Sequence, residues 1–175
     1  MTGKTHATAG AFAGALIGHL AGAPGIGMAV GALAGLLPDI DEPRSMIGRR
    51  ALLISTTVNL LAGHRGATHT VWFCTVAGVL FALLSAALGQ HLRAFIPTWP
   101  HCLVVGLMAF AGSLFHLVLD GCTRSGVKPF APLRLPAKLA WLEHPKGPVV
   151  TGTELVETPL AFLLLILSLK VGGVF

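Results

Sequence analysis

Charged residues are scarce in this chain. Asp, Glu, Lys and Arg make up only 11% of its 175 residues, whereas a soluble domain carries about 25%. Hydrophobic residues account for 54%, and the mean hydropathy is +0.78. This composition excludes an ordinary soluble protein and predicts an integral membrane protein, and its length suits a single domain that covers residues 1–175.

Cysteine is also rare, and its positions show no paired spacing. Cys74, Cys102 and Cys122 therefore suggest neither a disulfide framework nor a zinc ribbon. Cys74 and Cys102 fall within apolar runs, and we interpret them as packing residues. Cys122 stands two residues after Asp120, so it is a candidate soft metal ligand.

The first two apolar runs are short of the length that a straight membrane crossing needs, which is about 20 residues. They cover about residues 8–21 and 26–37, so they predict a tilted pair of helices or a re-entrant hairpin. Lys4 before the first run would also suit a cleavable secretory signal. The spacing of small residues favours a retained helix, because glycines at intervals of four let two helix backbones approach closely. These glycines are Gly10, Gly14, Gly18 and Gly22 in the first run, and Gly27, Gly31 and Gly35 in the second.

Later runs are longer and predict further membrane segments at about residues 71–88, 102–119 and 155–171. The run at 51–62 is too short to span, and we interpret it as an interfacial or half-buried helix. The expected fold is an all-α integral membrane protein, a compact helical bundle of about five membrane segments. Its first two segments form a short hairpin packed through glycines.

Basic residues gather on one side of this topology. Ten of them are Lys4, Arg44, Arg49, Arg50, Arg65, Arg124, Lys128, Arg134, Lys138 and Lys146. Only Arg93 and Lys170 fall on the other side, so the positive-inside rule places the N-terminus in the cytoplasm of a multi-pass protein. This rule explains the net charge of +5 better than a nucleic-acid partner does. The same residues can meet the headgroups of anionic membrane lipids.

Ionisable residues also stand at the ends of the apolar segments, all on the predicted cytoplasmic side. They are His6, Asp39, Asp41, His64, His69, His116, Asp120 and Glu154. Ionisable groups are costly beside hydrocarbon, and imidazoles with carboxylates in one layer are what a divalent metal needs. We therefore expect a metal site at this level of the bundle.

His116 and Asp120 are the strongest local pair, because a spacing of four puts both side chains on one helix face. Asp39 and Asp41 follow Pro38, where turn chemistry is the plain alternative. At least one of the two is expected to be a ligand, and Asp39 is favoured over Asp41.

His64 and His69 flank a glycine turn and can converge on one metal, although an interfacial pH-sensitive loop has the same pattern. Arg65 between them is a candidate clamp for an anion, together with Arg124 or Lys128. Glu154 is a candidate ligand or base, or a carboxylate that simply complements a helix N-terminus.

With these motifs, the chain resembles the YdjM-like family, described as inner-membrane metal-dependent hydrolases. The resemblance covers nearly the whole chain. It rests on Gly3-Lys4-Thr5-His6, Leu37-Pro38-Asp39-Ile40-Asp41, His64-Arg65-Gly66-Ala67-Thr68-His69, and His116-Leu117-Val118-Leu119-Asp120 with Thr123, Gly126 and Pro132-Leu133. It implies a location in a bacterial-type inner membrane.

That family is distantly similar to zinc-dependent phospholipase C and to single-strand-specific zinc nucleases. The similarity implies that His6, Asp39, His64 or His69, and the His116–Asp120 pair hold zinc. Those enzymes also use a His-x-x-x-Glu pair late in the chain, but here Val150 stands four residues before Glu154. They further bind a metal through a processed N-terminal amine, which nothing in this sequence suggests. One or two ions are therefore expected.

The function expected is a membrane-bound metal-dependent hydrolase in which metal-activated water attacks a phosphoester or ester. The metal ligands are His6, Asp39, His64, His69, His116 and Asp120, and the catalytic candidates are Asp41, Glu154 and Arg65. A lipid or lipid-linked substrate is expected because the site lies at the membrane. The alternative is a non-catalytic metal-binding membrane protein: a sensor, a transporter component or a structural partner that forms homo-oligomers through its glycine-rich faces. Transport is disfavoured because the predicted spans contain almost no charge.

Overall fold

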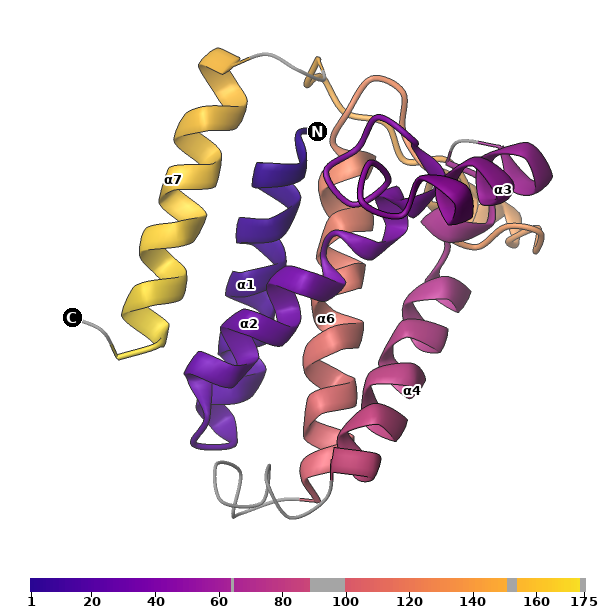
Figure 1. The fold of residues 1–175 in the computed structure, drawn as a ribbon. Coiled ribbons are helices and arrows are strands. Elements are labelled where there is room, and N and C mark those ends of the chain that lie inside the picture. Colours follow the sequence, from indigo (N-terminus) through magenta and orange to yellow (C-terminus); the bar gives the residue numbers. More distant parts are fainter. Residues whose placement is uncertain (64, 89–99, 151–153, 174–175) are drawn as a thin grey trace.

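In the computed structural model, residues 1–63, 65–88, 100–150 and 154–173 are described. This part of the chain is all-helical, which confirms the predicted class. Its helices are α1 (Gly3–Leu20), α2 (Pro24–Ala34), α3 (Leu52–Ala62), α4 (Val71–Leu88), α6 (His101–Gly121) and α7 (Glu154–Val171), with short 3₁₀-helices η1 (Leu37–Asp41), η2 (Ala67–His69) and η3 (Ala137–Leu142). Helix α6 packs against α1, α2 and α4, and α7 packs along the outer side of α1 (Figure 1).

Two described helices, α4 and α6, are long and apolar enough to cross a membrane. Both have a mean hydropathy of 2.2, but half of the α6 window is buried whereas 22% of the α4 window is. The difference follows from position, since α6 has neighbours on several sides and α4 lies at the edge of the bundle. Of the five predicted membrane segments, these two meet the criterion, and the other three stay predictions.

Large apolar side chains cover much of the outer surface. Leu155 and Phe162 on α7 are 85% and 63% exposed, and Leu53 and Leu61 on α3 are 86% and 84% exposed. Helix α3 stands apart from the main bundle, at the end where the N-terminus lies (Figure 1). An exposed apolar surface of this extent is expected where lipid is the solvent. Helix α3 is short, as predicted for the run at 51–62, and its interfacial position stays a prediction.

The α1–α2 hairpin is held by direct contact between glycines. A Cβ atom on Gly14 would lie 2.0 Å from the backbone oxygen of Gly27, and a Cβ on Gly31 would lie 2.1 Å from that of Gly10. Any side chain at these positions would force the helices apart, so the predicted glycine-packed hairpin is confirmed. A Cβ on Gly112 of α6 would likewise meet the Gly31 oxygen at 2.5 Å. Homo-oligomerisation through glycine faces stays a prediction, because the closest contacts here lie within one chain.

The end of the hairpin is fixed against α6 at the polar end of the molecule. Helix α2 ends near Gly35, and its last carbonyls have no partner within the helix. Ser113 of α6 donates its hydroxyl hydrogen to the Ala34 oxygen at 2.9 Å, and Nδ1 of His116 lies 2.8 Å from the Gly35 oxygen. The end of α2 is thereby fixed against the last turns of α6, and the chain continues into η1 beside them.

Candidate metal centre

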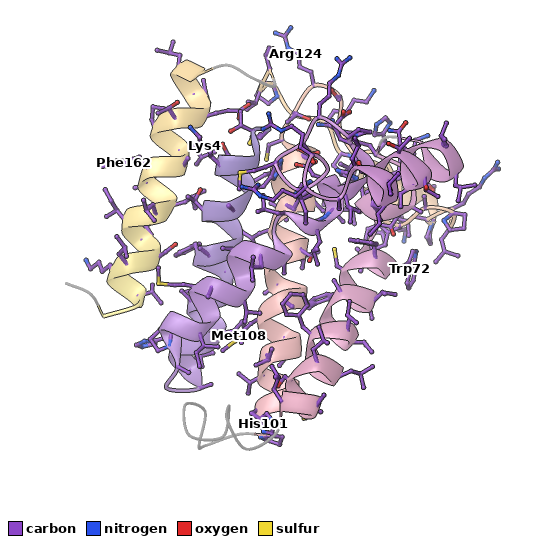
Figure 2. The ribbon with its side chains drawn as sticks, viewed as in Figure 1. Lys4, Trp72, His101, Met108, Arg124 and Phe162 are labelled. Atoms are coloured by element: carbon purple, nitrogen blue, oxygen red, sulfur yellow. The ribbon has the colours of Figure 1, made fainter. Side chains whose placement is uncertain are left out.

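The predicted ligands within the described residues come together at one end of the bundle. His6 comes from α1, Asp39 from η1, His69 from η2, and His116 and Asp120 from the last turns of α6. The three histidines are 0% exposed and Asp120 is 1% exposed. The sixth predicted ligand, His64, lies outside the described residues. Polar side chains concentrate at this end, near Lys4 and Arg124, whereas His101 lies at the far end of α6 (Figure 2).

Two imidazoles face each other at the middle of the cluster. Nε2 of His116 lies 3.2 Å from Nε2 of His69. Asp39 Oδ1 lies 3.6 Å from the first nitrogen and 3.9 Å from the second. Asp120 Oδ2 lies 3.6 Å from His69 Nε2 and 3.9 Å from His116 Nε2. Each of these carboxylate oxygens therefore lies within 3.9 Å of both nitrogens, and His69, His116 and Asp120 form a group whose ligand atoms lie within 4.8 Å of one another.

The outer nitrogens of both rings have acceptors beside them. Nδ1 of His116 faces the Gly35 carbonyl oxygen, which can only accept, so this nitrogen carries the hydrogen. Nδ1 of His69 lies 3.2 Å from Asp41 Oδ2 and takes the same state. In the neutral rings both Nε2 atoms then present lone pairs to each other. Such an arrangement is repulsive unless a cation shares them, and it is how metal-binding histidines are oriented.

The separations suit a small divalent cation. Ligand atoms about 2.1 Å from a tetrahedral zinc lie about 3.4 Å from one another. The five distances among His69, His116, Asp39 and Asp120 run from 3.2 to 3.9 Å. A set of two imidazoles and two carboxylates also suits zinc chemically. These residues therefore fit the metal that the resemblance implies.

His6 extends the cluster on its other side. Its ring stacks on that of His116, with centroids 3.6 Å apart and planes inclined by 17°. Its Nε2 lies 3.3 Å from Asp120 Oδ1, yet neither ring nitrogen has a hydrogen-bond partner among the described residues. Buried polar atoms are rarely left this way. The ligand atoms of His6, Asp39 and His116 lie within 4.8 Å of one another, which gives a second group able to hold a cation.

Asp120 also meets two positive groups. Nη2 of Arg65 lies 3.0 Å from its Oδ2, and the amine of Met1 lies 3.0 Å from its Oδ1. Arg65 sits in the left-handed region, with φ 59°, and its Nη1 donates to the Gly126 oxygen at 3.2 Å. Arg65, the predicted anion clamp, thus forms an ion pair with Asp120, a predicted metal ligand. The amine contact is a feature that the sequence did not suggest.

Asp41 occupies a supporting position behind His69. It is 0% exposed, and its Oδ2 accepts hydrogen bonds from the Thr68 hydroxyl at 2.6 Å and from the Arg65 backbone N–H at 2.8 Å. Asp39 faces the centre instead, and burial raises the pKa of its carboxyl group above the ordinary 3.8. The preference for Asp39 over Asp41 as the ligand agrees with this placement.

A pocket of about 790 Å³ opens beside the centre, and Asp39 and Arg65 form part of its wall. Lys4, Arg44 and Arg49 also line it. From the sequence, these three residues are expected to orient the protein and to meet anionic lipid headgroups, and the sequence does not indicate that they line one pocket.

Other candidates lie elsewhere. Arg124 and Cys122 are exposed, and Lys128 lines a different pocket. Neither group of candidate ligands among the described residues includes Cys122. The side chain of Glu154 lies outside the described part, whereas Glu157, three residues later, is 2% exposed and accepts hydrogen bonds from Thr2 and Thr5.

Comparison with known proteins gives consistent matches. The sequence pattern of the family described as YdjM inner membrane protein matches residues 1–174. YvsG of Bacillus subtilis (strain 168), described as uncharacterized, is 32% identical over 140 residues, which is 79% of this chain and 78% of that protein. The inner membrane proteins YdjM of Escherichia coli (strain K12) and of Shigella flexneri are each 34% identical over 116 residues, or 64% of this chain. That match spans about half, 52%, of their own length. No solved structure matches.

Proposed function

The chain belongs to the YdjM inner membrane protein family and is an inner membrane protein, and from this premise we propose that it is a metal-dependent hydrolase. One observation carries the proposal: Nε2 of His69 and Nε2 of His116 face each other at 3.2 Å while both Nδ1 atoms face acceptors. Asp39 and Asp120 add two oxygen ligands beside them. The cofactor is one or two divalent ions, of which zinc suits the donors best.

The residues divide into three roles. His69, His116, Asp39 and Asp120 hold the ion, with His6 as a further ligand beside Asp120. A divalent ion bound there supplies a water nucleophile at neutral pH and polarises the ester under attack. Arg65, at the wall of the pocket, offsets negative charge that develops on the substrate. Glu154 stays a candidate base.

Asp41 is assigned a positioning role in this proposal. Its Oδ2 already accepts from Thr68 and Arg65 and faces Nδ1 of His69. A carboxylate in that position fixes the orientation and tautomer of a metal-binding ring. A general base, in contrast, needs to reach the water that it activates, and Asp41 does not line the pocket.

The membrane arrangement completes the proposal. Five segments cross or enter the bilayer, the N-terminus is cytoplasmic, and the centre lies at the cytoplasmic interface. This arrangement is supported by the basic residues at the same end of the bundle as the metal centre. The exposed apolar side chains of α3, α4 and α7 support it as well. A substrate that reaches such a site is a lipid or lipid-linked phosphoester.

The test combines metal analysis with an activity screen on protein purified in detergent. His116→Ala and Asp120→Ala should lose the metal, and they should lose turnover of phosphomonoesters, phosphodiesters or lipid esters. His19→Ala is the matched control, because His19 is an exposed histidine on α1 outside both groups of candidate ligands. A parent protein that binds no metal, or variants that keep both metal and activity, would refute the proposal.

A non-catalytic metal-binding role is the second candidate, and the number of protein donors at the centre favours it. His69, His116, Asp39 and Asp120, with His6 beside them, offer enough ligand atoms to fill a four-coordinate site without water. Structural metal sites are closed, whereas catalytic sites keep an open position. Metal that is present in the parent and lost in both variants, with no turnover on any substrate, would select this candidate.

A further inference from the structure

The pocket beside the metal centre has three different walls. Asp39 and Arg65 form the wall that adjoins the centre, since both contact its ligand atoms. Lys4 and the loop that carries Arg44 and Arg49 form a basic wall. Helix α7 forms the third wall through Glu157, Thr158 and Ala161.

The three cations of the basic wall, Lys4, Arg44 and Arg49, have no ion-pair partner among the described residues. The pocket also contains the carboxylates of Glu42 and Glu157, which accept hydrogen bonds from the Arg44 backbone N–H and from Thr2 and Thr5. Three unpaired cations around a hollow of about 790 Å³ favour an anionic ligand. Guanidinium groups match phosphate oxygens best, because they donate two parallel hydrogen bonds.

The α7 wall gives the ligand its second property. Phe162 lies next to Ala161 on α7 and is 63% exposed, and Leu155 and Val156 at the start of the helix are 85% and 45% exposed. Helix α7 stands on the outside of the bundle (Figure 1), and Phe162 lies on this helix (Figure 2), so the exposed apolar side chains of α7 extend from the rim of the pocket. A ligand with a phosphate in the pocket and acyl chains along α7 satisfies both surfaces.

We propose that this pocket is a phosphate subsite for an anionic phospholipid, with Lys4, Arg44 and Arg49 binding the headgroup and α7 guiding the acyl chains. The subsite deepens the hydrolase proposal by naming its substrate class, and it rests on that proposal only for the chemistry that follows binding. Binding itself depends on the cations and on the pocket shape. It can therefore be measured on metal-free protein.

The experiment titrates full-length, chelator-treated protein in neutral detergent with three probes by calorimetry. The probes are dihexanoyl phosphatidic acid, dihexanoylglycerol and inorganic phosphate. Phosphatidic acid should bind more tightly than inorganic phosphate, and dihexanoylglycerol should not bind. The variant Lys4→Gln/Arg49→Gln should weaken phosphatidic acid binding about 100-fold or more, because it removes two charge-assisted hydrogen bonds and each is worth about tenfold or more.

Arg50→Gln is the matched control. Arg50 is as exposed as its neighbour Arg49, but it does not line the pocket, and its Nη1 donates to the Met46 oxygen at 2.9 Å. It should bind phosphatidic acid like the parent. Equal weakening by Arg50→Gln, or no phosphatidic acid binding to the parent, would overturn the proposal. Inorganic phosphate binding as tightly as the lipid would overturn the lipid source. Metal content of the parent is measured separately, so a failure of the metal-centre proposal shows as a parent protein that holds no metal and still binds phosphatidic acid.

Discussion

Asp41→Asn separates a positioning role from a catalytic base at this residue. The substitution keeps the shape of the side chain but removes its charge. Oδ2 of Asp41 accepts hydrogen bonds from the Thr68 hydroxyl at 2.6 Å and the Arg65 N–H at 2.8 Å. Nδ1 of His69 lies 3.2 Å from the same oxygen and 3.1 Å from the Thr68 hydroxyl oxygen, to which it donates. An amide oxygen can replace this acceptor, so the fold should survive. What is lost is the charge that holds the hydrogen on Nδ1 and raises the basicity of Nε2.

The expected result is weaker metal binding. Losing the partner of a metal-binding histidine costs about 10- to 100-fold in affinity, or about 1.4–2.7 kcal/mol. Competition with a chromophoric chelator measures this affinity directly. Turnover of Asp41→Asn should recover when metal is added to saturation, because the groups that meet the substrate are unchanged.

The control is Glu42→Gln, which removes the neighbouring charge. The Glu42 side chain accepts a hydrogen bond from the backbone N–H of Arg44 at 3.0 Å. This variant should bind metal like the parent. An Asp41→Asn protein with parental metal affinity and no turnover at saturating metal would refute the reasoning and assign Asp41 as the base.

Three further predictions concern stability in detergent, measured by thermal unfolding. Gly14→Ala should destabilise the protein by about 3 kcal/mol or more, because its Cβ would lie 2.0 Å from the Gly27 oxygen. Its control, Gly25→Ala, should be nearly neutral, because nothing lies within 4 Å of a Cβ at that position. Equal effects of the two substitutions would contradict the hairpin packing. Asp39→Asn should stabilise the metal-free protein at neutral pH, because burial raises the pKa of Asp39 and its ionised form opposes folding. That gain should shrink as pH falls through the raised pKa and vanish below the ordinary 3.8; a gain independent of pH would contradict it. Removal of metal with a chelator should lower the free energy of unfolding of the parent by about 2.7 kcal/mol, compared with parent protein in free metal at 100 times its dissociation constant. An unchanged melting temperature would argue against a bound metal.

The helices with abrupt apolar ends could be predicted closely from the sequence. The run expected at 71–88 is helix Val71–Leu88, and that expected at 51–62 is helix Leu52–Ala62. The first helix was placed too late, at about residue 8, because Lys4 and His6 interrupt the apolar pattern, although it begins at Gly3. Hydropathy marks where lipid begins, whereas the backbone continues its hydrogen bonds into the polar layer. The second run extends past its helix for a different reason: α2 ends at Ala34, whereas Leu36 and Leu37 continue the apolar pattern through the turn and into η1.

The level of the site along the bundle could be predicted from the sequence, but the separate roles of its residues could not. Segment ends fix which residues share a layer, which is enough to bring His6, Asp39, His69 and His116 together. The tautomers depend on acceptors that no pattern marks, such as the Gly35 carbonyl oxygen, which is free only because a helix ends there.

Basic residues at this interface can orient the protein in the membrane or bind a phosphate, and the sequence alone does not distinguish the two roles. The positive-inside rule counts Arg49 and Arg50 equally, because insertion depends on charge near the membrane and not on side-chain direction. Recognition of a phosphate depends on direction, and only Arg49 lines the pocket, while Arg50 turns back to the Met46 oxygen. The same layer of the membrane also contains the anionic headgroups, so residues that orient the protein already stand where a lipid phosphate arrives. A binding site for such a phosphate therefore needs only a hollow between these cations, and the gap between α7 and the loop after η1 provides it.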